Sequence, residues 1–382
     1  METRDFGYGD ISLLGFGFMR LPVKGTPAEI DIDLATEMVD LAIESGVNYF
    51  DTAYMYHNGE SENFAGRALS RHDRSSYKLA SKMPLLFLKE KSDLDKFFNE
   101  QLKKCRVDYF DFYMIHGITR NLVKLLRDLD VYDYVLRKKK EGRVKHIGFS
   151  FHDTPELLDE LLDEHPYDFA QIQLNYVDWE LQRSKTLYET LAAKKIPVIV
   201  MEPIRGGTLA NPCAEAVEIF KKADPDSSPA SWALRYAASL PGVQTVLSGM
   251  TTPEQLRDNL KTMKTLKPVT AEDQKVIDAA LLAFNKAANI PCTACRYCMD
   301  CPEGVEIPRN LGVFNNYERL LSEKHPWAKM IFKMEYDLLK TEERAQNCVS
   351  CGECVKHCPQ HIDIPHFLSE LDKLEKSAGA GA

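Results

Sequence analysis

Short apolar runs alternate with amphipathic helical stretches eight times in this 382-residue chain, up to roughly residue 285. The apolar runs are typical of buried strands and comprise Leu13–Gly17, Asn48–Asp51, Lys78–Lys82, Phe110–His116, Val144–Ser150, Phe169–Leu174, Val198–Met201 and Thr245–Ser248. The helical stretches cover 31–45, 60–70, 92–106, 121–141, 154–164, 183–194, 214–238 and 252–263, and many begin at capping residues. Eight strand–helix pairs predict a (β/α)8 TIM barrel.

A doubly wound open sheet is the rival fold for this alternation. Such sheets carry a glycine-rich turn after the first strand, and the segment from Gly15 to Arg20 lacks the third glycine of that fingerprint. We therefore expect an α/β chain, with the barrel over residues 1–285 and a further helix over 271–285 as its closing segment.

Eight of the ten cysteines fall in two compact runs after the barrel, and each run closes with Cys-Pro. The second run has the C-x2-C-x2-C-x3-C-P spacing of bacterial ferredoxins, in which three cysteines hold one [4Fe–4S] cluster and the fourth holds its neighbour. The predicted ligands are Cys292, Cys295, Cys298 and Cys301 in the first run and Cys348, Cys351, Cys354 and Cys358 in the second. Residues 286–382 are thus expected to form a mainly helical, ferredoxin-like domain with two clusters.

The ligand grouping follows the crossed rule of ferredoxins, so Cys358 would complete the first run and Cys301 the second. In the first run only two residues separate Cys298 from Cys301, so the position of Cys301 departs from the ferredoxin spacing. Zinc sites usually use separated C-x2-C pairs, and disulfides need an oxidising compartment, so both are weaker alternatives. Cys105 and Cys213 stand alone and are expected to be buried structural thiols.

From about residue 286 onward we expect a region with little apolar content of its own, so the clusters should supply much of its stability. The net charge of −9 argues against nucleic-acid binding. The longest apolar runs are too short to cross a bilayer. The chain opens on charged residues rather than on an apolar secretory signal, so a cytoplasmic location compatible with anaerobic metabolism is expected.

Four polar residues stand at or just after the ends of three consecutive predicted strands, where barrel enzymes carry their reaction sites. Taken singly, each has an ordinary structural role. A strand-end Asp usually caps a helix, a Lys is usually a solvated charge, and a His in an apolar run is usually a core residue whose hydrogen bonds are made within the protein. Together they predict a catalytic group, and they are Asp51, Tyr56, Lys82 and His116.

These residues resemble the signature of the aldo-keto reductases. The resemblance runs over nearly all of residues 10–265, through Asp51-Thr-Ala-Tyr-Met-Tyr56, Ser61-Glu62, Gly66, Gly148-Phe-Ser150, Gln171–Asn175, Pro203–Gly207 and Gly249–Asn259. The cysteine region resembles the dicluster extension of one iron–sulfur branch of that superfamily.

The resemblance implies reduction of an aldehyde or ketone by hydride from NAD(P)H. Tyr56 would protonate the carbonyl oxygen. A free phenol, with a pKa of about 10, is a poor acid near neutrality, and the ammonium of Lys82, held by Asp51, would correct this by stabilising the phenolate. His116 would hydrogen-bond the carbonyl oxygen and orient the substrate.

The resemblance also implies the cofactor contacts. Ser150 and Gln171 would hold the nicotinamide carboxamide, the Pro203–Gly207 loop would cross the pyrophosphate, and the loop after strand eight would hold the adenosine. The full predicted set is Gly17, Ser150, Gln171, Pro203, Arg205, Gly249, Thr251, Gln255 and Asn259. Phe151 replaces the usual Asn after the serine, and Gly249-Met250 stands where many relatives place a cation for the 2′-phosphate, so NAD versus NADP stays open. The alternatives to cofactor binding are structural. The glycines could simply form turns, and Arg205 could form a surface ion pair.

Hydride transfer moves two electrons together, whereas each cluster passes one. Three hypotheses follow. In the favoured one, the barrel reduces a small-molecule carbonyl while the clusters are structural or exchange electrons with an external one-electron carrier. In the second, the barrel binds a flavin, or substrate alone, and the clusters feed it. In the third, the protein is a non-catalytic redox or oxygen sensor. The substrate and the oligomeric state are left open.

Overall fold

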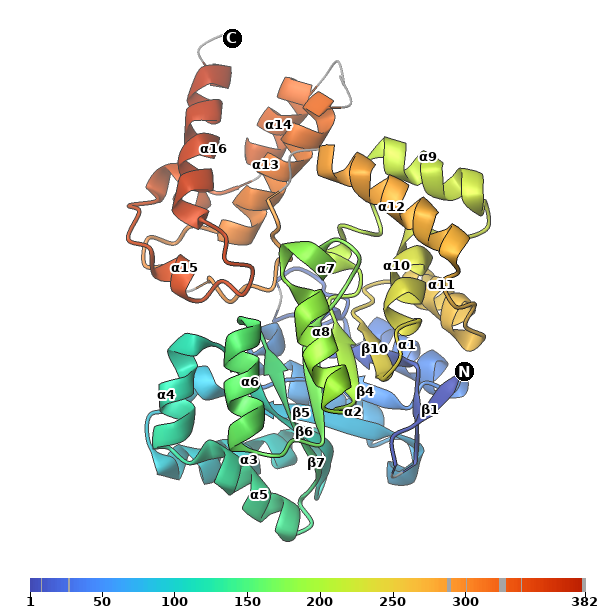
Figure 1. Ribbon diagram of the computed structural model, residues 1–382. Coiled ribbons are helices and arrows are strands. Elements are labelled where there is room, and N and C mark those ends of the chain that lie inside the picture. The colour runs from blue at the N-terminus through green and yellow to red at the C-terminus, as the bar shows by residue number, and fades with distance from the viewer. Residues whose placement is uncertain are drawn as a thin grey trace. The chain divides into compact units, whose positions relative to one another are not determined.

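The protein is described here as a computed structural model covering residues 1–379, except Tyr8, Pro27, 287–289, Asp300, 323–327 and Leu338. The chain forms two compact units (Figure 1). The first comprises Met1–Ile204 and Ala230–Thr270, and the second comprises Arg205–Pro229 and Ala271–Ala382. The predicted domain boundary between residues 285 and 286 stays a prediction. The compact units divide the chain differently, because each of them contains two separate segments of the sequence.

The first unit contains a closed barrel of eight parallel strands in the order β10-β3-β4-β5-β6-β7-β8-β9. The strands are β3 Leu14–Gly17, β4 Tyr49–Asp51, β5 Lys78–Met83, β6 Phe110–Ile118, β7 Val144–Phe151, β8 Phe169–Gln173, β9 Val198–Met201 and β10 Val243–Ser248. Each coincides with one of the eight expected runs, and nearly all their residues are buried, as parallel strands covered on both faces require. The barrel prediction is confirmed, and the open sheet is excluded.

Helices cover the outside of the barrel (Figure 1). They are α1 Ile32–Glu44, α2 Ser61–Leu69, α3 Lys91–Cys105, α4 Arg120–Asp128, α5 Val131–Lys140, α6 Pro155–Glu164, α7 Asp178–Leu181, α8 Ser184–Ala193, α10 Pro229–Ala238 and α11 Pro253–Lys264. The stretch expected as one helix over 121–141 is two, because Asp130 adopts a left-handed conformation (φ 52°) between α4 and α5. The 214–238 stretch is also broken, at Asp224, whose carboxylate accepts a hydrogen bond from Ser227.

A β-hairpin precedes the barrel and was not expected from the sequence. It consists of β1 Thr3–Asp5 and β2 Asp10–Ser12, paired antiparallel. Phe6 in its turn packs edge-on against Phe112 and Phe169 inside the barrel, with ring centres 4.9 and 6.1 Å away. The strands are too short for a periodic signal, and the contact that stabilises the hairpin is made by residues more than a hundred positions away.

The second unit is helical, as expected for the C-terminal domain. It contains α9 Ala214–Ala223, α12 Ala271–Lys286, α13 Ile307–Ser322, α14 Ala328–Asp337, α15 Glu353–Lys356 and α16 Ile364–Gly379. Helices α9 and α12 lie side by side, and α13 packs against both α14 and α16 (Figure 1). Contrary to expectation, the unit has an apolar core of its own, which includes Leu311, Phe332, Tyr336, Leu368 and Leu371. The expectation failed because these residues are spread along three helices at helical spacing rather than in runs.

Among the helices that the structure describes, none is long and apolar enough to cross a membrane.

Candidate functional site

The four predicted catalytic residues come from neighbouring elements at one end of the barrel. Asp51 is the last residue of β4, Lys82 lies one residue before the end of β5, and His116 lies near the end of β6. Tyr56 opens the short 3-10 helix Tyr56–Gly59 that follows β4. Because all barrel strands are parallel and adjacent in this order, their carboxyl ends bring the side chains together.

Lys82 is the centre of this group. Its ammonium donates hydrogen bonds to Asp51 Oδ1 at 2.6 Å and to the carbonyl oxygen of Thr52 at 2.8 Å. Its Nζ atom lies 3.3 Å from the Tyr56 hydroxyl. Lys82 is fully buried and Asp51 is 3% exposed, whereas Tyr56 retains 9% exposure. The phenol is therefore the most solvent-accessible member of the trio.

Burial dominates the electrostatics of the Asp51–Lys82 pair. It raises the pKa of Asp51 and lowers the pKa of Lys82, and the charge of each partner opposes the shift of the other. Asp51 Oδ2 is buried and has no hydrogen-bond partner among the described residues. The site therefore contains a dehydrated ion pair in direct contact with a phenol, an arrangement in which a positive charge stabilises the phenolate form.

His116 completes the group from the next strand. Its ring centre lies 6.0 Å from that of Tyr56, and the two rings are nearly perpendicular at 83°. Burial lowers the pKa of His116 well below its ordinary value of 6.5, and the nearby Lys82 charge and His152 act in the same direction. The ring is consequently neutral at physiological pH, with one N–H to donate.

A pH prediction follows from the His116 environment. Since its pKa lies well below 6.5, His116 should remain neutral as the pH falls through 6.5, so kcat/KM for carbonyl reduction should show no acidic limb near that pH. The measurement is the kcat/KM profile of the wild type and of His116→Gln, and we expect the variant to be slower with an unchanged acidic side. An acidic limb near pH 6.5 that disappears in the variant would contradict this view.

The loop that carries Tyr56 is held in a strained conformation that sequence reasoning missed. His57 and Asn58 both have left-handed backbone angles, with φ of 52° and 54°. His57 is 9% exposed, and its Nε2 accepts a hydrogen bond from the backbone N–H of Leu21 at 3.2 Å. Strained residues persist where their surroundings fix them. The run His57-Asn58-Gly59 was the available signal, because Asn and Gly tolerate this conformation.

Two predicted nicotinamide contacts lie on the strands following β6. Ser150 and Gln171 are 1% and 2% exposed, on β7 and β8. The Ser150 hydroxyl accepts a hydrogen bond from the backbone N–H of Gly117 at 2.7 Å. Gln171 Oε1 is buried and has no hydrogen-bond partner among the described residues. An unused buried acceptor fits the amide N–H of a nicotinamide carboxamide.

The predicted adenosine contacts follow β10, and several take part in internal hydrogen bonds. Gln255 and Thr252 form a capping box at the start of α11, and Asn259 donates to Ser248 Oγ at 2.9 Å. Thr251 donates its hydroxyl to the carbonyl oxygen of Arg20 at 2.9 Å. These bonds shape the loop, and cofactor contacts from these residues stay a prediction.

Arg20 and Glu202 were not singled out by the sequence. Their side chains form an ion pair at 3.3 Å, and Arg20 also covers Gly249, where an added Cβ would meet its side chain at 3.0 Å. Gly17, at the end of β3, lies against the backbone of Ser248 and Gly249. No spacing rule pointed to the Arg20–Glu202 pair, because its members are 182 residues apart.

The Pro203–Gly207 loop is partly buried and is not a simple surface turn. Pro203 is buried, and Arg205 is 2% exposed with its guanidinium 5.9 Å from the ring centre of Phe284 on α12. The alternative that placed Arg205 at the surface is therefore wrong. Gly206 has a φ of 65°, and an added Cβ would lie 2.6 Å from the carbonyl oxygen of Thr293. The predicted pyrophosphate loop thus packs directly on the residue after Cys292.

The two adjacent glycines of this loop provide a matched pair of variants. Both substitutions impose a strained positive φ, of 65° at Gly206 and 98° at Gly207, but only Gly206→Ala adds a backbone clash, since the added Cβ of Gly207 has nothing within 4 Å. We expect Gly206→Ala to be less stable than Gly207→Ala by about 1–3 kcal/mol, the usual range for overpacking, and to retain less iron. Anaerobic thermal unfolding and iron analysis measure both, and equal losses in the two variants would exclude the Thr293 contact as the cause.

The cysteine runs come together as the crossed grouping requires. Cys292, Cys295, Cys298 and Cys358 line one small cavity, together with apolar side chains such as Leu311, Ile362 and Ile364. In the other group, burial raises the pKa of Cys354 to about 11, and the neighbouring Cys348, Cys351 and Cys301 act in the same direction. None of the ten cysteines forms a disulfide, and Cys105 and Cys213 are buried as expected. Thiolates around a cavity fit an iron–sulfur cluster.

No group of three or more His, Cys, Asp or Glu side chains in the described ranges is placed to hold a single metal ion. The two cysteine groups differ in exposure. Cys298 and Cys358 in the first group are buried, whereas Cys351 in the second is exposed. The second group is therefore the more accessible to solvent.

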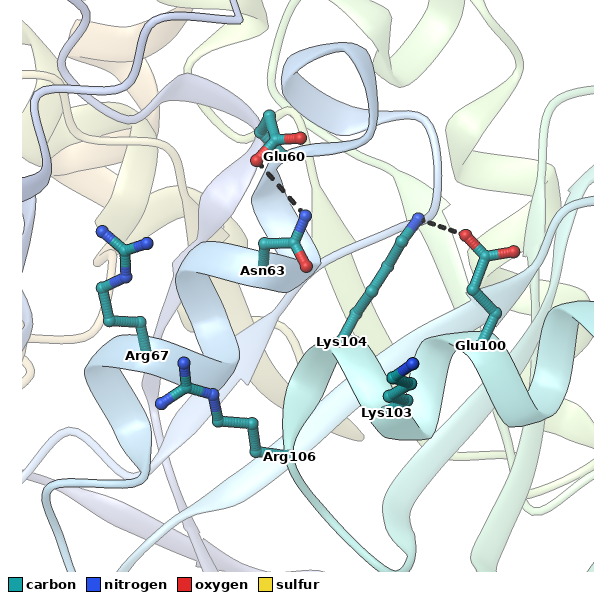
Figure 2. Close-up of a pocket in the computed structure, with 7 residues that line it drawn as sticks. All are labelled: Glu60, Asn63, Arg67, Glu100, Lys103, Lys104 and Arg106. Atoms are coloured by element: carbon teal, nitrogen blue, oxygen red, sulfur yellow. Dashed lines mark hydrogen bonds and ion pairs between the residues drawn. The ribbon is translucent and has the colours of Figure 1, made fainter.

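A separate surface pocket of about 480 Å³ lies between α2 and α3. Figure 2 shows its lining, which consists of Glu60, Asn63, Arg67, Glu100, Lys103, Lys104 and Arg106. Lys104 is paired with Glu100 at 2.8 Å. None of the four catalytic candidates lines this pocket.

Comparison with known proteins agrees with this geometry. The aldo/keto reductase family model matches residues 13–282, which is more than half of the chain, and a 4Fe-4S dicluster domain model matches residues 291–362. The chain belongs to the aldo/keto reductase family. It is an NAD(P)H-dependent oxidoreductase with a C-terminal 4Fe-4S dicluster domain, as the sequence predicted.

Curated relatives of this aldo/keto reductase match its barrel at low identity. An uncharacterized oxidoreductase, YqkF, of Bacillus subtilis is 26% identical over 73% of this chain and 96% of its own length. An NADH-specific methylglyoxal reductase of Escherichia coli is 22% identical, and the match covers 68% of this chain and 93% of the relative. Among solved structures, the holo form of aldo-keto reductase AKR11C1 from Bacillus halodurans aligns with a TM-score of 0.60 and 25% identity, covering 73% of this chain and 96% of that one.

Proposed function

We propose that this aldo/keto reductase reduces the carbonyl group of a small aldehyde or ketone, with Tyr56 as the general acid. The observation that supports this best is the contact of 3.3 Å between the Tyr56 hydroxyl and the buried ammonium of Lys82. A phenol in contact with a dehydrated cation can release its proton far more readily than a free phenol.

Each member of the group has a separate task in this proposal. NAD(P)H, when bound, supplies the hydride for the carbonyl carbon. Tyr56 gives its proton to the carbonyl oxygen, and Lys82 stabilises the phenolate that remains. His116, as a neutral donor, orients the carbonyl oxygen, and Asp51 keeps Lys82 in place through the 2.6 Å contact. Gln171 Oε1 and the Ser150 hydroxyl would hold the carboxamide.

The C-terminal domain is proposed to hold two [4Fe–4S] clusters with crossed ligands. The cavity lined by Cys292, Cys295, Cys298 and Cys358 supports this grouping, because Cys358 lies beside the first run although it is 60 residues or more away in the sequence. When bound, such clusters supply electrons one at a time. The exposure of Cys351 favours exchange with an external one-electron carrier at the second cluster.

The experiment for this function is an anaerobic assay with the cluster-loaded protein. Methylglyoxal serves as the carbonyl probe, since a relative of this family is a methylglyoxal reductase. We expect oxidation of NADH or NADPH that depends on the probe, and a denatured extract free of flavin. Released flavin together with no nucleotide-dependent reduction would favour the cluster-fed flavin alternative instead.

A further inference from the structure

The surface pocket between α2 and α3 carries an excess of positive charge. Its volume of about 480 Å³ lies in the size range of small-molecule sites. Positive side chains outnumber carboxylates around it by four to two. The cations are Arg67, Lys103, Lys104 and Arg106, and the carboxylates are Glu60 and Glu100 (Figure 2). Since the chain as a whole has a net charge of −9, this excess is a local property of the pocket.

Three of the four cations have no partner within the described protein. Lys104 is paired with Glu100 at 2.8 Å. The side chains of Arg67, Lys103 and Arg106 are exposed and form no ion pair or hydrogen bond with the residues that the structure describes. A lone exposed cation is ordinarily solvated. Three that share one concave pocket repel one another and concentrate their field there, so the pocket attracts anions.

Helix dipoles explain part of this arrangement. Arg67 lies in the last turn of α2, and Lys103 and Lys104 lie in the last turn of α3, where the carboxyl end of a helix favours positive charge. Each helix end supplies only about half a negative charge. Two such ends together offset about one charge, which leaves a surplus of about one positive charge in the pocket.

A backbone contact between the two helices fixes the walls of the pocket. A Cβ added to Gly66 would lie 2.1 Å from the carbonyl oxygen of Lys104, so α2 meets the end of α3 without a side chain between them. Arg67 directly follows Gly66, and Lys103 directly precedes Lys104. The fold therefore sets the positions from which these two cations extend, and this lowers the cost of ordering them around a ligand.

Arg106 reaches the pocket from a left-handed residue at the end of α3, with a φ of 55°. Glycine or asparagine is usual at such a position, since a Cβ makes this conformation unfavourable. In the view of Figure 2, Arg67 and Arg106 lie on one side of the pocket and Glu100 lies on the other. Each guanidinium offers planar N–H donors that bind phosphate oxygens in pairs.

We propose that this pocket binds a small molecule through its phosphate group, with Arg67, Lys103 and Arg106 as donors to the phosphate oxygens. A phosphate monoester has three acceptor oxygens and a charge of about −2, which suits three separate cations better than a single carboxylate does. Free phosphate and a phosphate ester share this chemistry. None of the predicted catalytic or cofactor residues lines the pocket, so its role does not depend on Tyr56 as the acid.

The test is calorimetric titration of the full, cluster-loaded protein with inorganic phosphate and with glycerol 3-phosphate, under anaerobic conditions at low ionic strength. Saturating NADH is present to occupy the nucleotide site. We expect a single phosphate group to bind per chain. Tighter binding of inorganic phosphate would identify free phosphate as the ligand, and tighter binding of glycerol 3-phosphate a phosphate ester; both support the site. Absence of saturable binding, or phosphate binding that NADH abolishes, would overturn it.

Single substitutions locate the bound phosphate. Arg67→Ala and Arg106→Gly each remove one cation and should weaken phosphate binding by about tenfold or more, the usual effect of losing a hydrogen bond between charged groups. Lys96→Ala is the matched control, because Lys96 is an exposed cation of α3 that does not line the pocket. It should bind phosphate as the wild type does. Equal weakening in Lys96→Ala would reveal a general effect of net charge and refute the site.

Arg106→Gly also separates a binding role from a structural one. Glycine relieves the left-handed conformation, so without phosphate this variant should melt at the wild-type temperature or above it. Phosphate should raise its Tm by less than that of the wild type, because a ligand stabilises only the protein that binds it. A lower Tm without phosphate, combined with an undiminished phosphate effect, would contradict the proposal. This variant decides the question even if Arg67→Ala does not fold.

Discussion

Tyr56→Phe is expected to lower kcat for carbonyl reduction by about 10²–10⁴-fold, the usual range for a positioned proton donor. The change removes one oxygen, and with it the acceptor of the hydrogen bond from Lys82 Nζ. Tyr56 is 9% exposed, so the ring itself should keep its packing and the fold should be retained. The measurement is steady-state kinetics under anaerobic conditions together with nucleotide binding, which we expect to be unchanged.

Tyr54→Phe is the matched control on the same loop. The Tyr54 hydroxyl points to Glu100 on α3, at 3.3 and 3.4 Å from its two carboxylate oxygens, and makes no contact with Lys82 that would support catalysis. This variant should keep nearly full activity. Similar losses in both variants would show that the loop, rather than the acid, is responsible.

Paired cysteine substitutions should reveal the crossed ligation. We expect the wild type to hold about eight irons, the sum of two four-iron clusters. Cys295→Ser with Cys358→Ser removes two ligands of one cluster, so about four irons should remain. Cys301→Ser with Cys358→Ser removes a ligand from each cluster and should leave fewer. Anaerobic iron analysis and electron paramagnetic resonance measure these contents.

The alternative grouping predicts a different order. If each run held its own cluster, Cys295→Ser with Cys301→Ser would spare one cluster, and Cys295→Ser with Cys358→Ser would damage both. Cys105→Ala is the control, since this buried thiol lies on α3, outside both runs. Iron loss in Cys105→Ala would show that unfolding, rather than ligand loss, sets the iron content.

The barrel could be predicted from the sequence because each strand is a local signal. The run at Val198 is a continuous stretch of apolar residues, and the capping box at Thr252 and Gln255 marks a helix start. The hairpin at Phe6 could not be predicted in this way, since its stability depends on Phe112 and Phe169. The break at Asp130 was also missed, because a single left-handed residue leaves the helical periodicity on both sides intact.

The grouping of the four candidate residues at one end of the barrel could be predicted, but their environment could not. The positions of Asp51, Tyr56 and Lys82 follow from strand ends, whereas full burial of Lys82 depends on how the barrel closes. Glu62 appeared in the sequence only as part of a signature, and its pairing with Gln101 joins residues 39 positions apart. The packing of Gly206 on Thr293 is likewise a contact between distant segments, invisible to any spacing rule.

The central claim, that a Tyr56-centred site reduces a carbonyl with NAD(P)H, is tested most directly by an anaerobic stoichiometry. Cluster-loaded protein is mixed with NADH or NADPH and methylglyoxal, and nucleotide oxidation, alcohol formation and cluster absorbance are followed together. We predict one nucleotide oxidised for each carbonyl reduced, with no net bleaching of the clusters, and loss of this turnover in Tyr56→Phe. Turnover that persists in Tyr56→Phe, or carbonyl reduction that proceeds from reduced clusters without nucleotide, would contradict the claim.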